Sequence, residues 1–132
     1  MNAYLAIKFK EDFSNRSLIE NICTALEIVG VQTTVMVRDL EKWGKTKFTP
    51  QEMMSKAFEE TDKADILIIE FSEKGVGLGI EAGYALAKGK PIIVIAKTGS
   101  EISDTLKGLA KDIIFYAEPD ELSEKFQRFI YS

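Results

Sequence analysis

The stretch from Ala64 to Phe71 reads ADILIIEF, and it decides the fold because it is short and almost continuously apolar. Such a run is typical of a central strand in a parallel sheet, where helices cover both faces of the strand. The stretch from Pro91 to Ala96, PIIVIA, repeats the pattern. A helix is expected between the two runs, over about residues 79–88, because Lys88-Gly89-Lys90-Pro91 supplies a stop and a turn. The sequence therefore predicts two buried strands joined by a helix.

Strands and helices alternate on either side of this stretch. Ser14, Thr49 and Ser100 are the expected helix caps, and Thr49 is followed by a proline and by Glu52 three residues later. Further strands are expected at residues 3–9, 31–37 and 112–117, and further helices at 14–30, 49–62, near 100 and from 119 onward. Five strands and five helices in alternation predict an α/β fold. We expect a three-layer sandwich whose five-stranded parallel sheet has the flavodoxin-like order 2-1-3-4-5.

Length and composition fit a single domain that spans residues 1–132. The chain is 45% hydrophobic and 29% charged, which is typical of a globular protein. It opens on an apolar stretch without the basic leader of a secretory signal, and no apolar run reaches membrane-spanning length. A cytoplasmic protein without a membrane partner is therefore expected. The net charge of -4 and the lack of a long basic run argue against polymeric nucleic acid as a partner.

The chain contains no histidine, and its single cysteine is Cys23. The missing histidine excludes Ser-His and Cys-His nucleophile pairs and the commonest metal ligand, so carboxylates must carry any acid-base chemistry. Cys23 lies among apolar residues at helical spacing, which favours a buried structural thiol. The sequence implies no metal or redox cofactor.

The stretch from Phe71 to Ala85, FSEKGVGLGIEAGYA, follows the central strand and contains the candidate ligand site. In a doubly wound parallel sheet, ligands bind beyond the carboxyl ends of the strands at the switch point, here between the first and third strands. The loops after these two strands are therefore expected to converge. Gly75, Gly77 and Gly79 would let the backbone approach a sugar or phosphate closely and adopt angles that other residues avoid.

Two phosphate-binding motifs do not fit these glycines. A dinucleotide-binding G-x-G-x-x-G pattern would need a glycine at Ala82 and the first strand in place of the third, and a P-loop would need Gly-Lys-Ser/Thr. Glu81 is expected in the first turn of the helix, where the positive end of the helix dipole keeps a carboxylate ionised. Such a carboxylate in a cleft can attack a sugar carbon and form a covalent glycosyl-enzyme. A surface glutamate that stabilises the helix start is the alternative.

Three segments carry a family resemblance: Tyr4-Leu-Ala, Ala64-Asp-Ile-Leu-Ile-Ile-Glu and Gly77-Leu-Gly-Ile-Glu-Ala-Gly-Tyr-Ala. Together with the order of elements, they resemble the nucleoside 2-deoxyribosyltransferase family, which includes the 2'-deoxynucleoside 5'-phosphate N-hydrolases. By this resemblance Glu81 is the nucleophile on the anomeric carbon of the sugar, and Tyr4 orients it or contacts the sugar. The glycine loop would lie against the sugar or its phosphate. The resemblance also implies a homo-oligomer.

The chain departs from the family pattern at two positions. Members usually carry Asp or Ser six residues before the nucleophile, where this sequence has Gly75, and an Asp on the preceding helix, where it has Ala57. Polar residues that lie close to these positions are Ser72, Glu73, Lys74, Glu59 and Glu60. In the family, the Asp or Ser handles the leaving base or a 5'-phosphate. Ser72, Glu73 or Lys74, which leave the third strand, could take over this role, although solvated loop residues explain them as well.

Several other residues are expected near the strand ends. Asp39, beside Arg38, reaches a strand end and is a candidate ligand contact, although a surface ion pair explains it as well. Trp43 could stack on a base or form a hydrophobic lid over the sheet edge. Asp65 begins a strand at the far end, so a structural hydrogen bond is expected. The candidate substrate-binding residues are Gly75, Gly77, Gly79, Ser72, Phe9 and Asp39.

The expected function is cleavage or transfer of the N-glycosidic bond of a (deoxy)nucleoside or nucleotide, with Glu81 and Tyr4 as the catalytic residues. The partner is then a small molecule, either a nucleoside or a nucleotide. A non-catalytic nucleotide-binding or regulatory module is the alternative, because this architecture hosts many functions.

Overall fold

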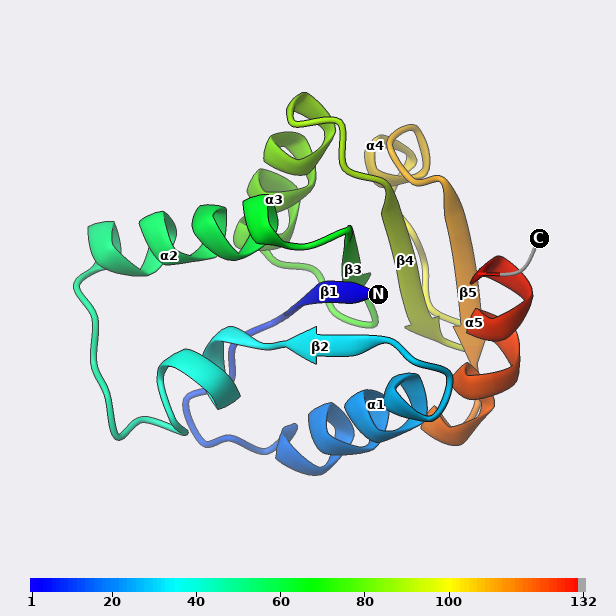
Figure 1. Ribbon diagram of the computed structural model, residues 1–132, viewed down its shortest axis with the longest axis horizontal. Coiled ribbons are helices and arrows are strands. Elements are labelled where there is room, and N and C mark those ends of the chain that lie inside the picture. Colours follow the sequence, from blue (N-terminus) through cyan, green and yellow to red (C-terminus); the bar gives the residue numbers. More distant parts are fainter. Residues whose placement is uncertain (131–132) are drawn as a thin grey trace.

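The computed structural model describes residues 1–130, and within them five parallel strands form one sheet in the order β2-β1-β3-β4-β5 (Figure 1). This arrangement confirms the predicted fold class and strand order. The strands are β1 (Asn2–Ile7), β2 (Gln32–Thr34), β3 (Ile66–Glu70), β4 (Ile92–Lys97) and β5 (Asp112–Tyr116). All five residues of β3 are buried, as expected for the central strand.

The register of β1 and β3 brings their carboxyl ends to the same level. Their paired residues run from Ala3 opposite Ile66 to Ile7 opposite Glu70. Since strand order reverses between these two strands, the segments that follow them leave the sheet at the switch point. The candidate site is built from those segments.

Five α-helices and two shorter helical turns cover the sheet in the described part of the chain. The α-helices are α1 (Arg16–Ile28), α2 (Pro50–Lys63), α3 (Val76–Ala87), α4 (Asp104–Lys107) and α5 (Leu122–Ile130). The turns are the π-helical η1 (Met36–Leu40) and the 3-10 turn η2 (Pro119–Glu121). Helices α1 and α5 pack on one face of the sheet, whereas α2, α3 and α4 pack on the other (Figure 1).

Alternate residues along the strands divide the core into two clusters. On β1, Leu5 points toward α1 and α5, whereas Tyr4 and Ala6 point toward α2 and α3. Cys23 is buried in the first cluster, and burial raises the pKa of its thiol. These observations support the structural role that was expected for this cysteine.

The second strand is shorter than predicted. It ends at Thr34 rather than Val37, because the chain turns into η1 directly afterwards. The Asp39 carboxylate fixes this turn by accepting a hydrogen bond from the Val35 N–H at 2.7 Å. Apolar residues after Thr34 therefore reflect burial of a turn rather than extension of a strand.

Local hydrogen bonds decide where the helices begin. Thr49 and Glu52 form the predicted capping box at the start of α2. Two other caps were predicted at the wrong residue: Asn15 rather than Ser14 precedes α1, and Ser103 caps α4 in place of Ser100. The Ser103 hydroxyl accepts a hydrogen bond from the Leu106 N–H at 3.3 Å.

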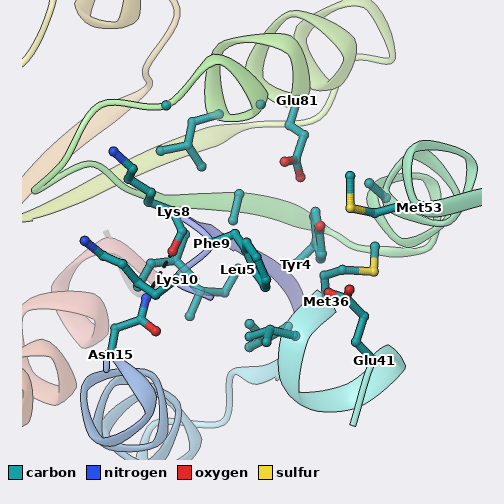
Figure 2. A pocket seen from close by; sticks show the side chains of 18 of the residues that line it. Tyr4, Leu5, Lys8, Phe9, Lys10, Asn15, Met36, Glu41, Met53 and Glu81 are labelled. Atoms are coloured by element: carbon teal, nitrogen blue, oxygen red, sulfur yellow. Dashed lines mark hydrogen bonds between the residues drawn. The ribbon is translucent and has the colours of Figure 1, made fainter. Parts of the chain in front are cut away.

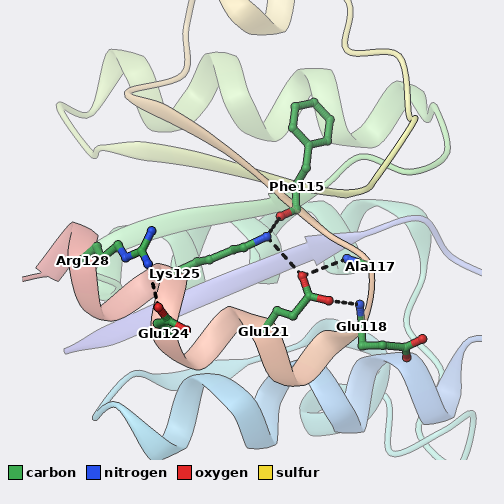
Figure 3. A network of polar contacts seen from close by, with 7 residues as sticks. All are labelled: Phe115, Ala117, Glu118, Glu121, Glu124, Lys125 and Arg128. Atoms are coloured by element: carbon green, nitrogen blue, oxygen red, sulfur yellow. Dashed lines mark hydrogen bonds and ion pairs between the residues drawn. The ribbon is translucent and has the colours of Figure 1, made fainter.

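A network of polar contacts joins β5 to α5 (Figure 3). The Glu121 carboxylate accepts hydrogen bonds from the N–H groups of Ala117 and Glu118, at 3.2 and 2.8 Å. Lys125 donates to Glu121 at 3.2 Å and to the Phe115 carbonyl at 2.5 Å. The predicted last helix thus begins as the 3-10 turn η2 before it becomes α5. No helix within residues 1–130 has the length and apolar character needed to cross a membrane.

Candidate active site

A pocket of about 200 Å³ lies at the carboxyl end of β1, beside the segment that follows β3. β1 and its loop form one wall, η1 and α2 form a second, and the start of α3 forms a third (Figure 2). The loops after the first and third strands therefore converge, as the switch-point argument predicts. Five of the predicted site residues line this pocket: Tyr4, Phe9, Gly75, Gly77 and Glu81.

Glu81 projects from α3 into the pocket (Figure 2). Helix α3 begins at Val76 rather than near Gly79, so Glu81 is its sixth residue and no acid lies in its first turn. The expected first-turn position is therefore wrong. Leu78 and Ala82 are buried on the inner face of α3, and this packing outweighs the low helix propensity of the glycines.

The Glu81 carboxylate is buried without full hydrogen bonding. Its Oε2 has no hydrogen-bond partner within residues 1–130. Burial raises the pKa of Glu81 to about 7, and an interaction with the Tyr4 hydroxyl lowers it in part. Burial therefore opposes the expectation that the helix dipole keeps this acid fully ionised, and part of the population is protonated at neutral pH. Because buried polar atoms are normally hydrogen-bonded, this oxygen is available to contact a ligand.

The three glycines have different roles from those expected. None has a positive φ; Gly75 is the extended residue before α3, and Gly77 and Gly79 lie inside the helix. The expected unusual backbone angles are thus wrong. A Cβ atom added at Gly77 would lie 3.9 Å from Glu81 Oε1, since the two residues are one helical turn apart. Gly77 therefore places no side chain beside this oxygen, whereas Gly79 lines a different hollow between α3 and α4.

Tyr4 holds its hydroxyl toward Glu81 (Figure 2). The residue is 3% exposed, and its ring packs in the core cluster beneath α2 and α3. Burial is the main reason that the pKa of Tyr4 lies well above its usual value, and the charge of Glu81 adds to it. The hydroxyl therefore remains protonated and can donate toward the carboxylate.

Two lysines that sequence reasoning missed line the pocket next to Phe9, which is 55% exposed. Lys10 forms an ion pair with Glu73, and this contact lowers the pKa of Glu73. Lys8 has no ion pair with any side chain of residues 1–130. Their position directly after the first strand, at the edge where ligands bind, is the signal that could have identified them.

Glu41 is a second carboxylate in the pocket, and it too was missed. It directly follows η1 and is half-buried, and burial raises its pKa. Its carboxylate has no hydrogen bond or ion pair within residues 1–130. The segment 38–48 lacks a periodic pattern, so only its position beside the sheet edge could have pointed to this residue.

Several known enzymes are similar to this chain in sequence or in fold. No protein-family model matches the chain. It is 29% identical over 136 residues to a Thermofilum pendens protein named "Putative 2'-deoxynucleoside 5'-phosphate N-hydrolase 1", with 98% of this chain and 95% of that protein covered. A CMP N-glycosidase of Clostridium botulinum, BcmB, shares the fold with a TM-score of 0.71 at 19% identity, over 98% of this chain and 99% of that one. A 2-deoxyribosyltransferase of Bacillus psychrosaccharolyticus shares it with a TM-score of 0.67 at 16% identity, over 93% and 90%.

The resemblance to the nucleoside 2-deoxyribosyltransferase family is confirmed. The structure shows what surrounds the two positions that depart from the pattern of this family. Ala57 lines the pocket from α2, and neither Glu59 nor Glu60 lines it. Glu60 instead forms an ion pair along the same helix, with its Oε1 3.6 Å from Lys63 Nζ. No acid of α2 therefore enters the pocket.

Ser72 lies outside the pocket beside Glu81. Its hydroxyl donates a hydrogen bond to the Glu70 carboxylate at 2.7 Å and accepts one from the Lys97 N–H at 2.9 Å. Ser72 lines an adjoining hollow that also contains Lys8 and Lys97. The serine thus contributes to the shape of the strand end rather than to the pocket beside Glu81.

The remaining candidates have structural partners outside the pocket. Asp39 does not line it, and its carboxylate accepts hydrogen bonds from Arg38 at 3.0 and 3.1 Å, as the ion-pair alternative predicts. Trp43 packs edge-on against Phe13 at 6.0 Å, and this packing favours the lid alternative. Asp65 accepts the expected structural hydrogen bond, from the Asn2 N–H at 2.8 Å.

Proposed function

We propose that this protein is an enzyme that cleaves or transfers the N-glycosidic bond of a nucleoside or nucleotide, with Glu81 as the nucleophile. Similarity to the named hydrolase, the CMP N-glycosidase and the deoxyribosyltransferase supports the reaction class. The observation that carries the proposal is the buried Glu81 carboxylate, which has an unpartnered oxygen and faces the Tyr4 hydroxyl across an open pocket.

The reaction begins when an ionised Glu81 oxygen attacks the anomeric carbon of the sugar. The bond between that carbon and the base nitrogen breaks, and its electron pair leaves with the base. Water, or a second base in a transfer reaction, then attacks the anomeric carbon and releases the Glu81 carboxylate. Tyr4 orients the nucleophile by donating a hydrogen bond to it. A pKa of about 7 leaves a substantial ionised fraction at neutral pH.

The arrangement of the pocket favours a nucleoside monophosphate as the substrate. Lys8 and Lys10 lie at one end, Glu81 and Tyr4 lie in the middle, and Met53 lies at the other end (Figure 2). A nucleoside monophosphate has the same order of chemistry, with an anionic phosphate, a sugar and a flat apolar base. In this orientation the phosphate reaches the lysines while the anomeric carbon faces Glu81.

A panel of nucleosides and nucleoside monophosphates, monitored for free base, tests the proposal. The wild-type protein should release base from at least one monophosphate, and Glu81→Gln should lower kcat by about 10³-fold or more, because no nucleophile remains. Glu27→Gln, on the exposed surface of α1, is the matched control and should retain activity. Tight binding without base release from any member would contradict catalysis and support the non-catalytic module.

A further inference from the structure

We propose that Glu41 is the acid that protonates the departing base. This inference rests on the proposed function and assigns the second carboxylate of the same pocket. A leaving base needs such an acid, because a base that departs as an anion carries a charge that is costly to form. Helix α2 presents Met53, Met54 and Ala57 to the pocket, and none of these side chains can give up a proton, so another element must provide it.

The position of Glu41 fits the base end of the pocket. Glu41 and Met36 lie on the side away from Lys8 and Lys10, with Tyr4 between the two ends (Figure 2). A sugar whose anomeric carbon faces Glu81, and whose phosphate reaches the lysines, directs its base toward Glu41. The two carboxyl groups then approach the glycosidic bond from different elements, as acid and nucleophile do in retaining glycosidases.

The backbone around Glu41 is held firmly. The Glu41 N–H donates to the Met36 carbonyl at 2.9 Å, and the Glu41 carbonyl accepts from the N–H groups of Gly44 and Thr46, both at 3.0 Å. Lys42 and Trp43 follow with φ values of 52° and 55°, which non-glycine residues rarely adopt. Such a conformation persists only where the surroundings enforce it, so Glu41 occupies a defined position at the pocket wall.

The electrostatic surroundings suit an acid that is protonated before reaction. The titratable groups that face the pocket around it are Tyr4 from β1, Glu81 from α3, and Lys8 and Lys10 at the opposite end. Glu60 of α2 lies outside the pocket but contributes a negative charge near Tyr4. Burial beside Met36 disfavours the charged form of Glu41 and raises its pKa.

The step balances without any added reagent. As Glu81 bonds to the anomeric carbon, the O–H bond of Glu41 breaks and its proton moves to a nitrogen or oxygen of the base. The base leaves with the electron pair of the C–N bond, and Glu41 becomes a carboxylate. Water then attacks the anomeric carbon, gives a proton to Glu41 and displaces Glu81. The sum is nucleotide plus water to base plus sugar phosphate, with both glutamates restored.

The test compares leaving groups. Wild-type protein, Glu41→Gln and Glu81→Gln are assayed on the monophosphate that the panel identifies, and on the same sugar phosphate carrying 4-nitrophenolate in place of the base. Since 4-nitrophenolate departs as a stable anion, it needs no proton. Glu41→Gln should lower kcat on the nucleotide by about 10²- to 10⁴-fold, and on the nitrophenyl compound by less than about tenfold. Glu81→Gln should lower kcat on both the nucleotide and the nitrophenyl compound.

A matched control isolates proton transfer from charge removal. Glu60→Gln removes a negative charge near Tyr4 without touching the pocket, and it should leave both rates within about threefold of the wild type. Glu41→Asp should retain part of the nucleotide activity, because it keeps the carboxyl group. Thermal unfolding of each variant checks that the fold is intact.

The outcomes separate the two proposals. Equal loss on both substrates in Glu41→Gln, or no loss on either, would overturn the role of Glu41 while leaving that of Glu81 intact. Wild-type turnover of the nucleotide without turnover of the nitrophenyl compound would also overturn it, because a better leaving group should need less assistance. No turnover of either substrate by the wild type would reject the proposed function and this inference together.

Discussion

Glu81 is a carboxyl group that the fold removes from water without giving Oε2 a partner. Such a group lowers the stability of the folded state whenever it is ionised, because its charge is better solvated in the unfolded chain. The neighbouring Gly77 adds to the cost, since a glycine inside a helix is less favourable than alanine by about 1 kcal/mol. Both features are what a desolvated, unpartnered nucleophile requires, so under the proposed function activity and stability oppose each other at this position.

Glu81→Gln should therefore stabilise the protein at alkaline pH. The pKa of Glu81 is about 7 in the folded chain against an ordinary value of 4.5, so the folded state binds the proton more tightly. Well below pH 4.5 the carboxyl group is protonated in both the folded and the unfolded state, so it costs no stability. The free energy of unfolding then falls as the pH rises from 4.5 to about 7, and it levels off above that pH. Urea unfolding at pH 8 should show the variant more stable by about 1–3 kcal/mol, with a much smaller difference at pH 4.

An exposed glutamate provides the comparison for this experiment. Glu27→Gln should change the free energy of unfolding by less than about 0.5 kcal/mol at either pH, because surface substitutions have small effects. Equal unfolding free energies of wild type and Glu81→Gln at both pH values would show that the Glu81 carboxyl is solvated.

The sequence could identify some site residues and not others for a physical reason. Glu81, Tyr4 and the glycines belong to a contiguous motif or to a strand, so local pattern and family resemblance found them. Glu41 and Lys8 line the same pocket only because the sheet brings three separate segments to one edge. Their neighbours along the chain carry no sign of that convergence.

Strand β3 ends in a hydrogen-bonded clamp. Glu70 is 2% exposed, and its carboxylate accepts hydrogen bonds from the Ser72 N–H and hydroxyl, both at 2.7 Å, and from the Tyr116 hydroxyl. Tyr116 lies at the end of β5, so the clamp connects the central strand to the edge strand. The segment between β3 and α3 starts from this fixed point, and α3 carries Glu81.

Tyr116→Phe should loosen the clamp and destabilise the protein. The variant leaves Glu70 Oε2 with one hydrogen bond in a buried position, which should lower the free energy of unfolding by about 1–3 kcal/mol. Tyr84→Phe is the control: the Tyr84 hydroxyl also donates to a carboxylate, that of Asp62 at 2.9 Å, but at an exposed site, so a smaller loss is expected. Equal losses in denaturant unfolding would show that the clamp contributes no more than a surface contact.

The bounds of the helices show what a sequence pattern can and cannot predict. The capping box of α2 was predicted correctly because its signal is local to residues 49–52. The early start of α3 and the turn η1 depend on packing against the sheet and on the Asp39 carboxylate, neither of which a hydrophobic pattern contains. Small residues in α3 therefore looked like a loop although they form a helix.

At the scale of the whole molecule, charge is distributed unevenly. The net charge is -4, yet Lys8, Lys10 and Lys97 lie together around the strand ends beside the pocket. A negatively charged ligand must therefore be attracted by a local field that opposes the overall charge. Such attraction is screened by salt.

Ionic strength should thus separate monophosphates from nucleosides. With Glu81→Gln, which binds without turnover, the Kd of the monophosphate should rise about three- to tenfold between about 0.05 M and about 0.5 M salt, while that of the nucleoside changes little. Lys8→Gln should weaken monophosphate binding by about tenfold and reduce the salt effect. Lys107→Gln, on α4, is the control. Calorimetry that finds the same salt dependence for both ligands would show that no phosphate reaches the lysines.

The global architecture was the most predictable feature of the chain. The chain has two continuously apolar strands, and its strands alternate strictly with helices. These features leave few possible topologies, because crossovers are right-handed and both faces of the sheet need helices. The observed register of β1 and β3 then fixes the edge at which a ligand can bind. Which side chains line the pocket at that edge could be seen only in the structure.

Three of the four methionines of the chain, Met36, Met53 and Met54, line the same pocket. Their thioethers give the base end an adaptable apolar surface, but peroxide converts a thioether into a polar sulfoxide. Because Cys23 is buried, these sulfur atoms are the more accessible targets for oxidants. Under the proposed function, oxidation would therefore impair base recognition while leaving the Glu81 carboxylate chemically unchanged, and methionine sulfoxide reductases could restore it.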